Sequence, residues 1–293
     1  MALDPKPAIK PFKKLRKLIR KLDPQPTAED VHHIRTYTRR IEATLAAIPD
    51  ICGRNEQRVL RESEKVRRCA GKVRDMDVLT AYVQKLNVDG EPRCVVRLLE
   101  HLGSERNRHG RKLYRKAQQV QSSLRPALKQ SANMLDDVLQ DQRGSHAAGL
   151  ARDAASDVLR LSAELRNPSR LGKNNLHPYR LKVKELRYVL QNAQPKADPR
   201  LVEALEKVKD EIGEWHDWEE LVAITSELFV DNRHPGCKLV RELRAIAEKK
   251  FRQALATTER FQEKYFPSPS GKKNSGRTGV PRPILESAGR MAA

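Results

Sequence analysis

Apolar residues recur every three or four positions along most of this chain, which is the spacing of amphipathic α-helices. The clearest stretch is 176–190, where Leu176, Val183, Leu186 and Leu190 fall on one helical face. A second stretch, 31–45, places Val31, Ile34, Ile41 and Leu45 in the same way. Alternation of Val, Ile and Thr, which would indicate strands, is nowhere sustained. The pattern therefore predicts an all-α fold.

Both stretches carry basic side chains directly beside the apolar face. On a helix of 100° per residue, five residues of the stretch 176–190 cover an arc of about 100° next to the core: His177, Arg180, Lys184, Arg187 and Tyr188. The stretch 31–45 repeats the arrangement with His32, Arg35, Arg39 and Arg40. A solvated basic face would lie opposite the apolar one. We therefore expect these rows to line a groove between packed helices.

The same pattern predicts the order of elements. Residues 1–11 hold three prolines and are expected to be disordered. A short basic helix over 12–22 either packs on the body or contacts a membrane surface or partner. Thr27 to Asp30 is a helix start signal. Further helices are expected at 27–48, 54–70, 71–86, 93–121, 122–140, 147–166, 176–190, 199–213, 214–232 and 236–265, with a flexible basic tail at 267–293.

Two glycine motifs suggest a duplication. Gly71 and Gly213 are each followed by a basic residue and an Asp: Arg74-Asp75-x-Asp77 and His216-Asp217-x-Glu219. His32 and His177 precede them in the same order. The expected organisation is a basic segment at 1–23, a duplicated helical region at 24–266 with repeats 24–142 and 145–266, and the tail.

Charge and cysteine content narrow the function classes. The 293 residues include 58 Lys and Arg against 38 Asp and Glu, a net charge of +20, which predicts an anionic partner. Aromatic residues make up 4%, too few for extensive base stacking. The four cysteines form no CxxC pair, and no signal peptide or membrane span is apparent, so a reduced cytoplasmic location is expected.

These motifs resemble the CHAD family, the conserved histidine α-helical domain. The resemblance rests on His32-x-x-Arg35-x-x-x-Arg39-Arg40, on Gly71-x-x-Arg74-Asp75-x-Asp77 and on the 177–188 motif, and it spans about 30–266. It implies two four-helix bundles related by a pseudo-twofold axis, with a basic cavity between them. It also implies binding of inorganic polyphosphate, often at polyphosphate granules. Glu42 and His216 depart from the family pattern. The CYTH domain of some relatives is absent, which removes the usual reason to expect catalysis.

The resulting hypothesis is a non-enzymatic polyphosphate-binding protein with no catalytic residues, no metal and no cofactor. The site residues expected to bind polyphosphate are His32, Arg35, Arg39, Arg40, Arg74, Arg106, Arg111, His177, Arg180, Lys184, Arg187 and Tyr188. Weak non-specific nucleic-acid binding and a homodimer remain open. The alternatives are a nucleic-acid-binding helical module and, less favoured, an enzyme acting on phosphoanhydrides. The acids after each glycine are interpreted as caps that orient arginines, rather than as a Mg²⁺ or acid–base cluster.

Overall fold

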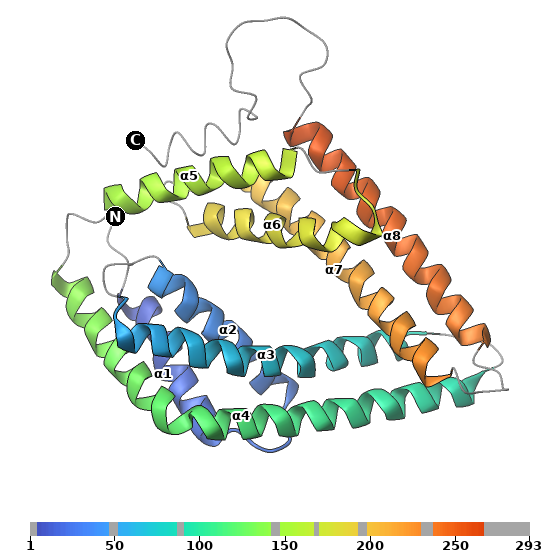
Figure 1. The fold of residues 1–293 in the computed structure, drawn as a ribbon, viewed down its shortest axis with the longest axis horizontal. Coiled ribbons are helices and arrows are strands. Elements are labelled where there is room, and N and C mark those ends of the chain that lie inside the picture. Colours follow the sequence, from blue (N-terminus) through green and yellow to red (C-terminus); the bar gives the residue numbers. More distant parts are fainter. Residues whose placement is uncertain are drawn as a thin grey trace, which may run out of the picture. The chain divides into compact units, whose positions relative to one another are not determined.

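A computed structural model describes residues 5–46, 52–86, 91–141, 147–166, 170–192, 198–229 and 237–266. Within these ranges the chain forms eight helices and no strand (Figure 1), which confirms the all-α prediction. The chain divides into two compact units, Met1–Ser145 and His146–Ala293, and each contains four of these helices. None of the described helices is long and apolar enough to cross a membrane.

Unit 1 contains α1 (Pro5–Lys21), α2 (Ala28–Ala46), α3 (Arg54–Val83) and α4 (Pro92–Asp141). Helix α1 packs on α2 and α4, α2 packs on α3, and α3 packs on α4, so the four helices close around one core. That core includes Ile34 and Ile41 of α2, Val66 of α3 and Leu113 of α4. At the start of α2, the Asp30 amide donates to Thr27 Oγ1 (3.1 Å) and the Thr27 amide donates to Asp30 Oδ2 (3.2 Å). This reciprocal cap confirms the predicted start signal.

Helix α1 corrects the expectation that residues 1–11 are disordered, because it begins at Pro5. Its apolar stripe starts earlier than expected, with Ile9 buried beside Phe12, Leu15 and Ile19 in the unit 1 core. Pro5 and Pro7 lie in the first turn, where the missing amide hydrogens have no partner within the helix. Of the two alternatives for this segment, packing on the body is the one that the burial supports.

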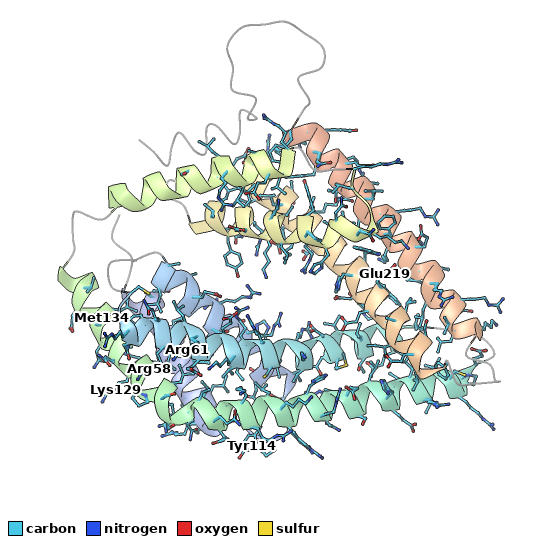
Figure 2. All side chains as sticks on the ribbon, viewed as in Figure 1. Arg58, Arg61, Tyr114, Lys129, Met134 and Glu219 are labelled. Carbon is cyan, nitrogen blue, oxygen red and sulfur yellow. The ribbon has the colours of Figure 1, made fainter. Side chains whose placement is uncertain are left out.

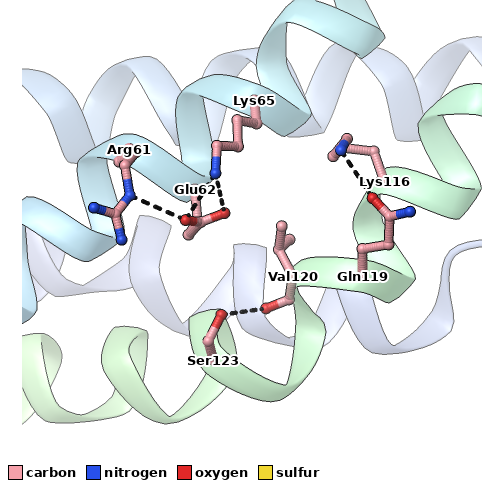
Figure 3. Close-up of polar contacts among 7 residues, drawn as sticks. All are labelled: Arg61, Glu62, Lys65, Lys116, Gln119, Val120 and Ser123. Atoms are coloured by element: carbon pink, nitrogen blue, oxygen red, sulfur yellow. Dashed lines mark hydrogen bonds and ion pairs between the residues drawn. The ribbon is translucent and has the colours of Figure 1, made fainter.

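Three predicted helix breaks are wrong. Helix α3 runs through Gly71, and α4 continues through 122–126 to Asp141. A glycine within a helix costs only about 1 kcal/mol relative to alanine, which tertiary packing readily offsets. In α4, Pro126 removes one backbone hydrogen bond, and the helix changes direction along its length (Figure 1) without ending. Nearby, the Ser123 hydroxyl donates to the Val120 carbonyl oxygen at 3.1 Å (Figure 3).

Unit 2 contains α5 (Ala147–Arg166), α6 (Lys173–Asn192), α7 (Pro199–Leu228) and α8 (Cys237–Tyr265). Helix α6 packs between α5 and α7, and α7 packs on α8. The third wrong break is here, since α7 runs through Gly213. The expected apolar face of α6 lies in the core: Leu176, Val183, Leu186 and Leu190 are 0–1% exposed. The expected tail at 267–293 lies outside the described residues, and the duplication of the chain stays a prediction.

Candidate anion-binding site

Helix α2 positions the first basic row by burying the apolar face next to it. Val31, Ile34, Ile41 and Leu45 are buried, and this fixes the rotation of the helix. Arg35 and Arg39 are then half-buried, whereas His32 and Arg40 are exposed. The His32 ring lies close to Thr36, with 3.4 Å between Nε2 and Oγ1. As predicted, the row flanks the core without entering it.

Arg35 is the centre of a group of guanidinium side chains in unit 1. It interacts electrostatically with Arg39 on its own helix and with Arg67 and Arg74 on α3. We call these four residues the arginine cluster. Burial lowers the pKa of Arg35, Asp75 raises it, and the three other arginines lower it further. The cluster therefore concentrates positive charge, with Asp75 beside it and Glu42 paired to Arg67 at 3.6 Å.

Gly71 allows Arg35 to approach α3 closely. A Cβ atom at position 71 would lie 3.1 Å from Nη1 of Arg35, which is tighter than an ordinary van der Waals contact. The glycine thus provides space for a guanidinium group against the helix surface. Arg67 and Arg74 lie four residues before and three residues after it, on the same face of α3.

Unit 2 repeats this contact with α6 and α7. A Cβ atom at Gly213 would lie 2.8 Å from Nη2 and 3.0 Å from Nε of Arg180. Nε of Arg180 donates a hydrogen bond to the Lys209 carbonyl oxygen at 3.0 Å. Lys209 and His216 lie four residues before and three residues after Gly213, so they correspond in position to Arg67 and Arg74. Lys184 on α6 corresponds to Arg39 in the same way.

His177 and His216 form a close pair across α6 and α7. Their ring centroids are 4.4 Å apart, with 37° between the ring planes. His177 is half-buried, and its Nδ1 has no hydrogen-bond partner among the described residues. Burial lowers the pKa of His177, and the neighbouring His216 and Arg180 lower it further. This histidine is therefore held towards its neutral form.

Arg187 and Tyr188 continue the row along α6. Arg187 forms an ion pair with Glu206 of α7, and its guanidinium lies over the Tyr188 ring at 5.3 Å from the centroid. Lys209 also pairs with Glu206, and with Asp210 at 2.9 Å. Arg187 and Glu206 line a shallow hollow together with Leu190, Gln191, Pro199, Val202 and Glu203. The carboxylates here offset part of the positive charge of unit 2.

The structure places two predicted site residues elsewhere. Nε of Arg106 donates to Asp77 Oδ1 at 2.7 Å, and Nη2 donates to the Pro26 carbonyl oxygen at 2.9 Å. Arg106 therefore joins α4 to α3 and to the segment before α2, and these contacts favour a structural role. Arg111 is exposed on α4 and is not among the residues that interact with Arg35. Binding by these two residues stays a prediction.

Three residues of the arginine cluster and the corresponding positions of unit 2 were not among the predicted site residues: Arg67, Lys209 and His216. Arg67 and Lys209 each lie four residues before a glycine, and this spacing within a helix could have revealed them. They were overlooked because the glycines were interpreted as helix ends, which separated each residue from the glycine that follows it.

Other cations of unit 1 have different surroundings. Figure 3 shows Glu62 between Arg61 and Lys65, which donate to it at 3.1 and 3.0 Å. Arg58, labelled in Figure 2, is exposed nearer the start of α3. The described residues include no group of three or more His, Cys, Asp or Glu side chains suited to a metal ion.

Comparison with known proteins agrees with this architecture. The model of the CHAD domain family matches residues 11–224. The fold is similar to the crystal structure of the CHAD domain from the plant Ricinus communis, with a TM-score of 0.54 and 15% sequence identity, over 88% of this chain and 94% of that chain. No curated protein matches the sequence. Since the family match covers well over half of the sequence, including both histidine motifs and both glycines, the chain belongs to the CHAD domain family.

Proposed function

We propose that this protein binds inorganic polyphosphate without chemically altering it. The observation that carries the proposal is the arginine cluster, in which Arg35 is held against Gly71 with three further arginines in electrostatic range. Unit 2 has cationic residues at three of the four corresponding positions, Arg180, Lys184 and Lys209, with Arg180 against Gly213. Each unit thus offers a group of positive side chains fixed by helix packing.

The chemistry of these side chains suits a polyanion that has no bases. A guanidinium group donates two parallel hydrogen bonds to a phosphate, and such charge-assisted bonds are worth about 1.5–3 kcal/mol each. Cations three or four residues apart on a helix are about 5–6 Å apart, which is comparable with the repeat of a phosphate chain. Arg35 and Arg39 have this spacing in unit 1, and Arg180 and Lys184 have it in unit 2.

The carboxylates near the clusters support binding without catalysis. Asp77 accepts a hydrogen bond from Arg106, and Asp75 lies within the electrostatic range of Arg35. Carboxylates that are engaged with arginines in this way orient cations and are poorly placed to act as general bases. The cellular location that accompanies this proposal is the cytoplasm, at polyphosphate granules.

A competition experiment tests the function. Fluorescently labelled long-chain polyphosphate is bound to the protein at fixed ionic strength and displaced with unlabelled polyphosphate, RNA, DNA or ATP. We expect polyphosphate to compete best at equal phosphate concentration. Equal competition by RNA or DNA would instead support the nucleic-acid-binding alternative. Release of orthophosphate during the incubation would support the alternative that the protein is an enzyme acting on phosphoanhydrides.

Substitutions then locate the site. Arg39→Glu reverses one charge of the arginine cluster, and Arg58→Glu makes the same change on an exposed arginine elsewhere in unit 1. We expect the first variant alone to weaken polyphosphate binding strongly, with helicity and thermal stability nearly unchanged in both. Equal losses in the two variants would mean that only the net charge matters.

A further inference from the structure

The two units carry different cations at corresponding positions. The arginine cluster of unit 1 consists of Arg35, Arg39, Arg67 and Arg74, and the corresponding residues of unit 2 are Arg180, Lys184, Lys209 and His216. An arginine stays charged at every pH at which the protein is folded, whereas a histidine changes charge near neutrality. Only unit 2 therefore has a position in this set whose charge depends on pH.

His216 also lies against a second histidine ring, that of His177. The two ring centroids are 4.4 Å apart, and both residues are half-buried. In unit 1 the residue that corresponds to His177 is His32, which is exposed and lies beside Thr36 and His33. Nδ1 of His177 is buried and has no hydrogen-bond partner among the described residues, so the fold leaves this nitrogen unsatisfied.

The charged groups around the pair are mostly cations or already paired. On α6, Arg180 lowers the pKa of His177, and Lys173 pairs with Glu219 of α7 and Glu248 of α8. On α7, Lys209 forms ion pairs with Glu206 and Asp210. Glu214 forms an ion pair with Lys250 of α8, and Asp217 also interacts with other groups. On α5, Arg160 forms an ion pair with Glu185 of α6, and Glu164 forms one with Lys182 of α6. None of these carboxylates is among the groups that shift the pKa of His177.

We propose that His177 and His216 form a proton-dependent phosphate subsite in unit 2, which holds a phosphate of the polyanion when both imidazoles are charged. This inference rests on the proposed function. Two imidazolium rings this close repel one another, and Arg180 adds to the repulsion. A phosphate oxyanion beside them compensates both charges and accepts a hydrogen bond from each ring.

The sign of the effect follows from linkage. Without ligand, the pKa of His177 lies below its ordinary value of 6.5. A bound anion raises it, so binding takes up protons, and affinity increases as pH falls through the interval between the two pKa values. Each unit by which binding raises a pKa strengthens the affinity at most about tenfold across that interval. Long-chain polyphosphate is the suitable probe, since its internal phosphates keep a constant charge in this range.

The test measures polyphosphate affinity from about pH 8 to about pH 6 at constant ionic strength. Wild type is compared with His216→Gln, which keeps a donor that cannot charge, and with His216→Arg, which installs the residue of unit 1. His101→Gln, at a half-buried histidine of α4 outside the basic rows, serves as the control. We expect both variants at position 216 to flatten the pH profile, with His216→Arg binding more tightly than wild type at the alkaline end. His101→Gln should retain the wild-type slope.

Two contrary results have separate meanings. Polyphosphate binding with parallel pH profiles in wild type and all variants would overturn the subsite and leave the proposed function standing. Absence of polyphosphate binding at every pH would overturn both. A direct readout that does not depend on variant folding is the NMR titration of histidine rings in wild type. The pKa of His177 should rise when polyphosphate is added, and a constant value would overturn the subsite.

Discussion

The guanidinium group of Arg180 lies so close to Gly213 that a methyl group at that position would come within 2.8 Å of its Nη2 atom. The same arginine donates a hydrogen bond from Nε to the carbonyl oxygen of Lys209, one turn earlier on α7. The backbone at Gly213 is helical, so the residue is required for space and not for an unusual conformation. The glycine acts on the site by determining where Arg180 can lie.

Alanine substitutions separate this role from helix propensity. In a helix, Gly→Ala stabilises by about 0.5–1 kcal/mol when the methyl group meets nothing. Gly103 in α4 has no atom within 4 Å of the added Cβ, so Gly103→Ala should show this gain and unchanged polyphosphate binding. Gly213→Ala should lose most of the gain, because Arg180 must move, and should weaken binding. Urea unfolding and polyphosphate titration measure the two effects, and identical behaviour of the two variants would contradict the assignment.

Charge reversal at Arg74 should weaken polyphosphate binding without affecting the fold. Arg74 is exposed on α3 and belongs to the arginine cluster, and Arg58 is exposed about 160° around the same helix. Arg74→Glu should reduce affinity about tenfold or more, since it removes a charge-assisted contact and adds repulsion. Arg58→Glu should have only the smaller effect of net charge. A binding isotherm for each variant, with circular dichroism as the folding control, decides between them.

Arg106 should matter more for stability than for binding. Its ion pair with Asp77 is largely shielded, with 24% and 14% of the two side chains exposed. Arg106→Ala leaves Asp77 without this partner and should destabilise unit 1 by about 1–3 kcal/mol. Chemical denaturation measures the loss, and the double variant with Asp77→Asn should recover part of it. If Arg106→Ala kept the stability of wild type but no longer bound polyphosphate, Arg106 would be a binding residue instead.

Helix α1 should be an integral part of unit 1. Phe12 is completely buried in the core, whereas its neighbour Lys13 is exposed. Phe12→Ala should reduce the free energy of unfolding by about 3–5 kcal/mol, and Lys13→Ala should change it little. Thermal denaturation of the two variants provides the comparison. A small effect of Phe12→Ala would mean that α1 detaches readily from the other helices.

Stability without ligand should decrease as the solution becomes acidic. Burial, above all, lowers the pKa of both His177 and His109 below 6.5, so the folded protein binds fewer protons there than the unfolded chain. Their contribution is fully present above the unfolded pKa of 6.5 and is lost as pH falls below it. The double variant His109→Gln/His177→Gln should show a weaker decrease in melting temperature between about pH 7 and about pH 5.5. A decrease equal to that of wild type would exclude these histidines as its source.

The sequence predicted the helices best where apolar spacing was regular and capping residues were present. The expected range 147–166 matches α5, and Thr27 with Asp30 marks the start of α2. The prediction of helix ends at Gly71 and Gly213 was wrong, because the low helix propensity of glycine was interpreted as a break. Tertiary packing keeps α3 and α7 continuous through these residues. The prediction also missed that the apolar stripe of α1 extends to Ile9.

The site was predicted one helix at a time. The basic rows of α2 and α6 could be read from spacing along the chain, and both lie beside buried faces as expected. Contacts between helices could not be read in this way. Arg67 joins the arginine cluster from α3, whereas Arg106 is held by Asp77. Periodicity gives the face of a helix on which a residue lies, but it does not identify the neighbouring helix.

The ion pairs of Glu42 with Arg67 and of Arg187 with Glu206 have opposite polarity. In unit 1 the acid is on α2 and the base on α3, whereas in unit 2 the base is on α6 and the acid on α7. Glu42 and Arg187 stand at corresponding positions, ten residues after His32 and His177. Replacement of Glu42 by the arginine of unit 2 would place like charges beside Arg67 and oppose the packing of α2 on α3. The acid at position 42 therefore allows α3 to carry Arg67 against α2 without repulsion at this contact.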